Sequence, residues 1–165
     1  MDLHLSTSYD ATPEEVFAII TDVTFQEQVL ERLGALSYDV STLESDEDVM
    51  LHVRWETPPD DVSGVMRRLV GERLVVEQNK IWHPAAADGA READVEGETA
   101  GTRVRLTGHT SIIPTGHATT QTFDLDVTAS VPVVSHRLEQ VVADAVRTRL
   151  ETKFELAWSW LAGAL

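Results

Sequence analysis

Six polar or amphipathic side chains share a strand face with apolar residues in the predicted sheet. They are Tyr38, Trp55, Gln78, Lys80, Trp82 and Thr110. Side chains alternate between the two faces of a strand, so residues in phase with an apolar row point inward. Pockets for small molecules are mainly apolar with a few placed polar groups that orient the ligand. The six residues predict such a pocket. The alternatives are that the two tryptophans fill the core and that Gln78 and Lys80 lie near an exposed strand end.

Other site chemistries lack their residues or their spacing. The chain has no cysteine, which excludes disulfides, thiol catalysis and thiolate metal sites. The six histidines form no HxxxH or HExxH pattern, and His4, His52, His83 and His109 fall on outward strand positions. No GxSxG motif and no glycine-rich phosphate loop occurs. We therefore expect no catalytic residue, no metal and no cofactor.

The charge balance bears on partners and location. The chain has 13 Lys+Arg against 28 Asp+Glu, a formal net charge of −15. Nucleic-acid affinity depends on basic residues that displace counterions, so nucleic acid and anionic membranes are disfavoured as partners. No stretch approaches the roughly 18 apolar residues that span a bilayer. We expect a cytoplasmic protein without membrane insertion, either a monomer or a weak homodimer.

The first third of the chain predicts a strand and two short helices. Residues 3–9 alternate between apolar and polar side chains, which is typical of a half-buried strand. Thr12-Pro13 followed by Glu15 is a helix start signal, with threonine as the N-cap and proline in the first turn. A second short amphipathic segment covers 25–33 and ends at Gly34. At 165 residues the chain suits one domain.

The rest predicts six further strands and one long helix. The inward rows of two hairpins have opposite parity, so each needs an even loop, for which we take 44–47 and 114–117. The first loop sets Tyr38 opposite Val53. From 132 onward the apolar period becomes 3.6, which predicts a helix of about 32 residues, or roughly 48 Å.

This order of elements resembles the helix-grip fold of the START-like superfamily, which includes polyketide cyclases, pollen-allergen-like proteins and lipid-transfer domains. The opening STSYDATPEEVFAIITD is similar to the usual start of that superfamily. The segments LVGERL (69–74), TASVPVV (128–134) and the last helix resemble a bacterial family of unknown function. The resemblance covers 1–165 and implies an α+β fold, with about seven antiparallel strands curved around the C-terminal helix. It also implies a cavity for a lipid-like or polyketide-like molecule.

The predicted cavity lies between the sheet and the last helix. Its candidate lining residues are Tyr38, Val53, Trp55, Val76, Gln78, Lys80, Trp82, Leu106, Gly108, Thr110, Phe123, Leu125, Leu138, Val141, Val142 and Ala145, with Thr148 or Arg149 further along the helix. The connection between the third and fourth strands is a candidate lid, through Val65, Met66, Arg67, Arg68 and Leu69. A short packing helix with solvated arginines is the alternative for that connection.

Three functions fit these features. The first is a non-catalytic protein that binds an apolar or amphipathic small molecule in the cavity. The second is a cyclase or dehydratase in which Tyr38, Lys80 or histidines transfer protons, which requires at least two titratable groups around one site. The third is a co-chaperone-like interaction module that presents its acidic surface to a basic partner.

Overall fold

The computed structural model describes residues 1–58, 67–68 and 73–163. The elements in chain order are β1 (Asp2–Tyr9), α1 (Pro13–Ile20), α2 (Val23–Arg32), β2 (Ser37–Ser45), β3 (Asp48–Thr57), β4 (Leu74–Trp82), β5 (Arg91–Thr99), β6 (Val104–Thr115), β7 (Ala118–Ala129) and α4 (Ser135–Leu161). The predicted α+β class and the predicted order of elements are confirmed.

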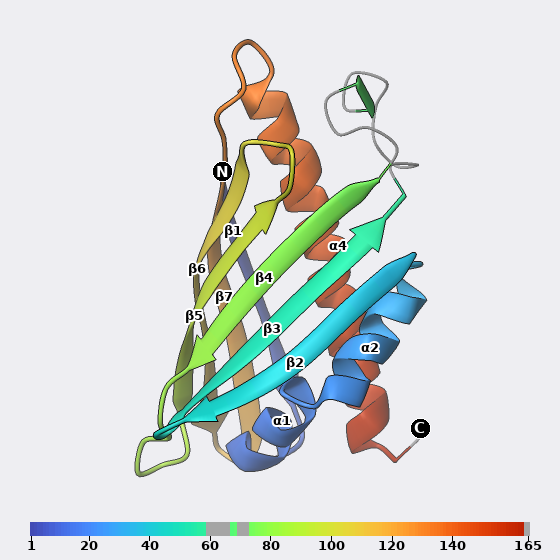
Figure 1. The fold of residues 1–165 in the computed structure, drawn as a ribbon. Helices are drawn as coiled ribbons and strands as arrows, with labels where there is room; N and C mark the ends of the chain where they lie inside the picture. The colour runs from blue at the N-terminus through green and yellow to red at the C-terminus, as the bar shows by residue number, and fades with distance from the viewer. Residues whose placement is uncertain (59–66, 69–72, 164–165) are drawn as a thin grey trace.

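The strands form one antiparallel sheet in the order β1-β7-β6-β5-β4-β3-β2. The sheet curves around α4, which crosses its concave side, and α1 and α2 lie beside the C-terminal half of that helix (Figure 1). Inward and outward positions alternate along each strand, as the burial of β7 shows. The concave face of the sheet and α4 therefore enclose the interior.

Local capping explains where the two short helices begin. The side chain of Thr12 accepts a hydrogen bond from the backbone N–H of Glu15 at 3.2 Å, and Pro13 occupies the first turn. Asp22 caps α2 by accepting from the N–H of Phe25 at 2.9 Å. Both caps satisfy backbone donors that a helix start leaves without an intrahelical partner. The start signal at Thr12-Pro13 is confirmed.

Both predicted hairpin loops are too long by two residues. Ser45 pairs with Asp48, so Tyr38 lies opposite Trp55 rather than opposite Val53. Thr115 pairs with Ala118, which leaves a two-residue connection in the second hairpin as well. Asp46 and Gly116 have φ of 55° and 68°, which lets the chain reverse within two residues. The loops remain even, so the inward faces are as predicted although the register is shifted.

The long helix starts later than predicted. It covers Ser135–Leu161, which is 27 residues. Val133, two residues before the start of the helix, has a φ of 74°, a conformation that a β-branched residue rarely adopts. The Oγ of Ser135 accepts a hydrogen bond from the N–H of Val131 at 3.0 Å and so fixes the connection to the helix. The chain therefore turns at 131–134 instead of continuing as helix.

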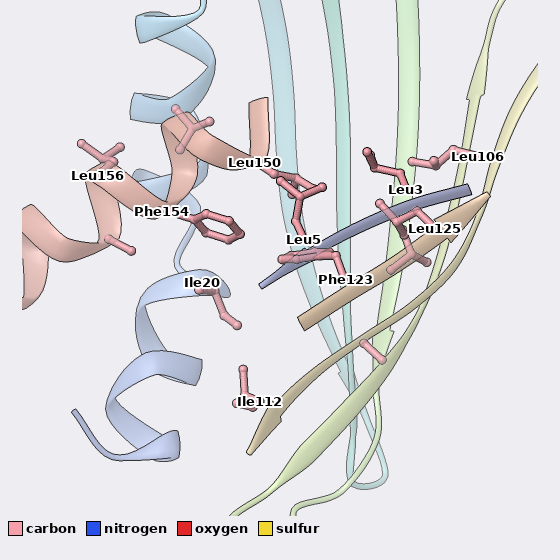
Figure 2. Packing of buried hydrophobic residues seen from close by; sticks show 14 of the residues in the cluster. Leu3, Leu5, Ile20, Leu106, Ile112, Phe123, Leu125, Leu150, Phe154 and Leu156 are labelled. Atoms are coloured by element: carbon pink, nitrogen blue, oxygen red, sulfur yellow. The ribbon is translucent and has the colours of Figure 1, made fainter. Parts of the chain in front are cut away.

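The core lies between the concave face and the second half of α4. Figure 2 shows Phe154 of α4 directed toward the strands that carry Leu5 and Phe123. The rings of Phe123 and Phe154 have centroids 6.1 Å apart and a tilt of 43°. Trp160 meets Phe25 of α2 edge-on at 5.5 Å. Aromatic contacts thus tie α4 to the sheet and to α2.

Gly108 is required where β6 and β7 approach each other. A Cβ at this position would lie 2.1 Å from the carbonyl oxygen of Asp124, and φ is 153°. Backbone atoms cannot move aside as a flexible side chain does. By contrast, a Cβ at Gly97 in β5 would find its nearest atoms at 3.5 Å, an ordinary contact.

We expect Gly108→Ala to lower the free energy of unfolding by about 3 kcal/mol or more, because the methyl group forces the two strands apart. Gly97→Ala is the matched control and should change stability by less than about 1 kcal/mol. Urea unfolding followed by circular dichroism measures both. Equal effects for the two variants would contradict this account of Gly108.

Candidate functional site

Three polar or amphipathic side chains of β4 point into the interior, as their parity predicted. Gln78, Lys80 and Trp82 are buried, and their neighbours Asn79 and Ile81 are only partly so. Lys80 pairs with Leu51 on one side and with Val95 on the other, so it sits well inside the sheet. Its side chain is 5% exposed and therefore does not reach water as the alternative proposed.

A small cavity lies next to Lys80, between the sheet, the two short helices and α4. It is lined by Tyr9, Ile20, Phe25, Gln26, Lys80, Trp82, Gln121, Phe123, Lys153 and Phe154. Its volume is about 10 Å³, which is close to the minimum that holds one water molecule. At this point of the interior, the side chains of the protein leave little free space.

Two lysines meet at this cavity. Lys153, one of the inward residues of α4, is 8% exposed. Burial lowers the pKa of Lys80 to about 7, and the positive charge of Arg149 adds to the effect. Burial, together with the nearby charges of Lys80 and Arg149, holds the pKa of Lys153 well below its ordinary value of 10.5. Desolvation disfavours the charged form, so both amines release protons readily.

Arg149 lies one helical turn before Lys153. Its Nη1 donates a hydrogen bond to Oε1 of Gln78 at 2.8 Å, and its guanidinium carbon lies 3.9 Å from the ring centroid of Trp55. Its Nε and Nη2 are buried without a hydrogen-bond partner. Burial lowers the pKa of Arg149 to about 10, so the group stays charged at neutral pH. Trp55 and Gln78 therefore hold a cation whose remaining donors face the interior.

Neutral polar atoms in the interior also lack partners. Oε1 of Gln26, Nε1 of Trp82 and Oγ1 of Thr110 are buried and form no hydrogen bond. The amide nitrogen of Gln26 donates to the carbonyl of Ile20 at 2.6 Å, which fixes the free oxygen at the cavity wall. A buried polar atom without a partner costs free energy that an apolar atom would not.

One polar pair in the cavity wall is satisfied. The hydroxyl of Tyr9 donates to Oε1 of Gln121 at 2.8 Å, which joins β1 to β7. Burial raises the pKa of Tyr9, so its phenol stays protonated and keeps donating this bond.

The structure brings some of the predicted lining residues together and separates others. Lys80, Trp82 and Phe123 line the cavity, and Gln78 and Trp55 contact Arg149 beside it. Val53, Leu106, Thr110, Leu125 and Leu138 are buried, and Val76, Gly108, Val141 and Val142 are partly buried, but none of them lines the cavity.

Two predicted lining residues lie elsewhere. Tyr38 is half-buried against α2, where its hydroxyl donates to Oε1 of Glu31 at 2.6 Å, because β2 is the edge strand that α2 covers. Ala145 is exposed, and Ala143 is buried in its place. In the predicted lid, Arg67 and Arg68 are exposed, and Val65, Met66 and Leu69 lie outside the described residues.

Several lining residues were not predicted, and Lys153 matters most. It follows Arg149 by four residues, so both lie on one helix face, next to the buried Leu150 and Phe154. A basic pair inside an apolar stripe is a usable signal, but basic side chains on helices usually extend to water. Gln26, Gln121 and Tyr9 come from three other elements, and only the fold brings them together.

The histidines lie outside the interior. His83 Nε2 and His109 Nδ1 each lie 2.9 Å from a carboxylate oxygen of Asp94 on the outer face of the sheet. The hydrogen bond to Asp94 raises the pKa of His83. Within the described residues, no group of three or more histidine, aspartate or glutamate side chains is placed to hold a metal ion.

The geometry defines a helix-grip fold, in which a curved antiparallel sheet encloses a long C-terminal helix. The chain belongs to the family DUF2505, described as a protein of unknown function, whose model matches residues 4–161. The comparison with curated proteins finds no match. No helix in the described part of the chain is long and apolar enough to cross a membrane.

Solved structures share this fold at low sequence identity. A crystal structure of a protein from Thermus thermophilus superposes with a TM-score of 0.66 at 16% identity and covers 99% of both chains. A STAR-related lipid transfer protein from Xanthomonas axonopodis gives 0.64 at 15% identity, covering 98% of this chain and 85% of that one. An aromatase/cyclase from a Streptomyces species gives 0.60 at 9% identity, with 96% and 92% covered.

The buried lysine on α4 generates a stability prediction. Lys153→Met should raise the free energy of unfolding by on the order of 1 kcal/mol or more, because it removes a desolvated amine and keeps the apolar stem. Arg147→Met removes a positive charge from an exposed position of the same helix and should have little effect. Chemical denaturation at pH 7 compares the two variants. A loss of stability in Lys153→Met would contradict the prediction.

The lowered lysine pKa values also predict a pH dependence. Between pH 7 and about 9.5 the unfolded chain keeps lysine protons that the folded protein has released, so these two groups make stability rise with pH. The N-terminal amine opposes this trend, because its hydrogen bond to Asp126 raises its pKa.

The difference between the wild type and Lys80→Met/Lys153→Met isolates the lysines, because the N-terminal amine is common to both proteins. We expect the free energy of unfolding of the wild type, minus that of the double variant, to increase as pH rises. Urea unfolding at several pH values measures this difference. A constant difference would contradict the lowered pKa values.

Proposed function

We propose that this protein binds a hydrophobic or amphipathic small molecule between the concave face of its sheet and α4, without catalysing a reaction. Residues 1–165 would act as one START-like domain, located in the cytoplasm. The observation that carries the proposal is the set of buried polar atoms without partners, on Gln26, Trp82 and Thr110. Because each unpartnered atom costs free energy in the unliganded protein, a bound molecule that supplies partners accounts for them.

A ligand requires more space than the cavity offers. Sites for small molecules usually measure about 300–1,000 Å³, against about 10 Å³ here. Binding therefore requires α4 or neighbouring side chains to move.

The burial along α4 favours its first half as the place of opening. Five of its seven buried residues lie in the second half, and only Leu138 and Ala143 in the first. Segments with few buried contacts open at lower free energy than well-packed ones. The same half includes Val142, which packs only partly buried against the core.

Two of the structures with this fold support a small-molecule ligand. One is called a STAR-related lipid transfer protein and the other an aromatase/cyclase. A shared fold hosts unrelated functions, so the proposal rests on the interior of this chain, and the names of the two proteins support it only in general terms.

An enzyme of cyclase or dehydratase type is the second candidate. Lys80, Lys153 and Tyr9 line one cavity, which meets the requirement for two or more titratable groups around one site. A lysine with a pKa of about 7 is suited to proton transfer at neutral pH. The histidines and Tyr38 are no longer candidates for proton transfer, because they lie outside the cavity.

The remaining expectations stay predictions. They are the absence of nucleic-acid binding, a monomeric or weakly dimeric state, and the co-chaperone-like alternative. A pull-down that returns a salt-sensitive basic partner would favour the last of these over ligand binding.

We expect native mass spectrometry and a panel of apolar molecules to reveal one bound ligand per chain. Val142→Trp should weaken that binding about tenfold, because the larger side chain fills the space that opens under the first half of α4. Ala145→Trp is the matched control, since Ala145 is exposed on the same helix. Binding that responds equally to the two variants would place the ligand elsewhere.

A further inference from the structure

The distribution of basic residues in this chain is uneven. Lysine occurs only at 80 and 153, and both lysines are buried at the same cavity. Arg149 adds a third basic side chain one helical turn from Lys153. Buried lysines are rare because the charged form loses its hydration, and they are usually paired with an acid.

In the part of the chain that the structure describes, no acid pairs with these three basic side chains. Among the described residues, Lys80, Arg149 and Lys153 take part in no ion pair, although the chain has 28 carboxylates. Lys80 and Lys153 hydrogen-bond to each other, and the remaining contacts are with neutral groups. Lys80 Nζ lies 5.0 Å from the ring centroid of Phe123, and Arg149 contacts Gln78 and Trp55. Within the described part of the chain, the charge of Arg149 therefore has no acidic partner at neutral pH.

The free donors of Arg149 have a suitable geometry for a bidentate anion. Its Nε and Nη2 are both buried and without a partner, whereas Nη1 is occupied by Gln78. A guanidinium presents N–H groups in a fixed planar fork, which matches the two oxygens of a carboxylate. Trp55 stacks on the guanidinium plane and keeps this fork from rotating.

We propose that the molecule bound in the interior is an amphipathic carboxylic acid, whose carboxylate is held by Arg149 with Lys80 and Lys153, and whose apolar body lies along the first half of α4. This proposal rests on the function proposed above and specifies the chemical class of the ligand. Leu138, Val142 and Val146 supply the apolar side of the helix in that direction.

Binding of this kind is coupled to protonation. The titratable groups around the carboxylate are Lys80 of β4, Lys153 and Arg149 of α4, and Tyr9 of β1. A bound carboxylate favours the charged form of both lysines, so it raises their pKa values and takes up protons at pH 8. Affinity should then fall as pH rises above neutrality.

The test compares decanoate with decan-1-ol, which has the same apolar body without the charge. We expect decanoate to bind at least about tenfold more tightly by isothermal titration calorimetry. Arg149→Gln and Lys153→Met should each remove most of that preference, whereas Arg147→Gln, at an exposed position, should keep it. Lys153→Met is expected to fold, because it removes an unfavourable burial.

The two lysines permit a direct second measurement. Protein labelled with ¹³Cε-lysine should give two lysine signals, and decanoate should raise the pKa of both in a pH titration.

Equal binding of decanoate and decan-1-ol would overturn the proposal that the ligand is a carboxylic acid, while leaving the proposed function in place. Binding of neither, nor of any molecule in the wider panel, would overturn both. Decyl phosphate bound in preference to decanoate would overturn the carboxylate in favour of a phosphate ester.

Discussion

The packing of α4 against the concave face of the sheet is the contact on which the interior depends. Phe154 meets Phe123 of β7, and Trp160 meets Phe25 of α2, so the second half of the helix is fixed at both sides. The same placement carries Lys153 to Lys80 and Arg149 to Gln78. One helix therefore contributes to the hydrophobic core and also brings Arg149 and Lys153 close to Lys80.

The burial of apolar side chains and the burial of basic side chains have opposite effects on stability. Burial of each large apolar side chain contributes about 1.5–3 kcal/mol, and Leu150, Phe154 and Leu156 supply this on α4. The amines beside them lose their hydration, which costs free energy unless a partner or deprotonation compensates. Burial lowers the pKa values of Lys80 and Lys153, and no carboxylate among the described residues pairs with them to oppose that effect. Apolar packing thus holds the basic groups in place.

The period of two along the strands was enough to predict the faces of the sheet, and with them the inward position of Lys80. It could not fix the registers, because parity accepts any even loop and the turns at Asp46 and Gly116 are two residues shorter than assumed. The cavity was harder to predict, since four of its ten lining residues, Tyr9, Ile20, Phe25 and Gln26, come from β1, α1 and α2, which were not expected to line it. The inward position of Lys153 was not predicted, because a lysine on a helix normally extends to solvent. It is buried only because of how α4 packs against the sheet.

The surface of the protein is acidic, whereas its interior contains basic side chains, and this difference affects which molecules reach the site. With a net charge of −15, the field around the protein repels anions, so small free anions are not steered toward it. An apolar body supplies a driving force that does not depend on the sign of that field. Once inside, an anionic group meets Arg149 and the two lysines in a medium where charges interact more strongly than in water. An acidic exterior around a basic interior is therefore the arrangement that favours the proposed ligand, an acid with a long apolar part, over small free anions.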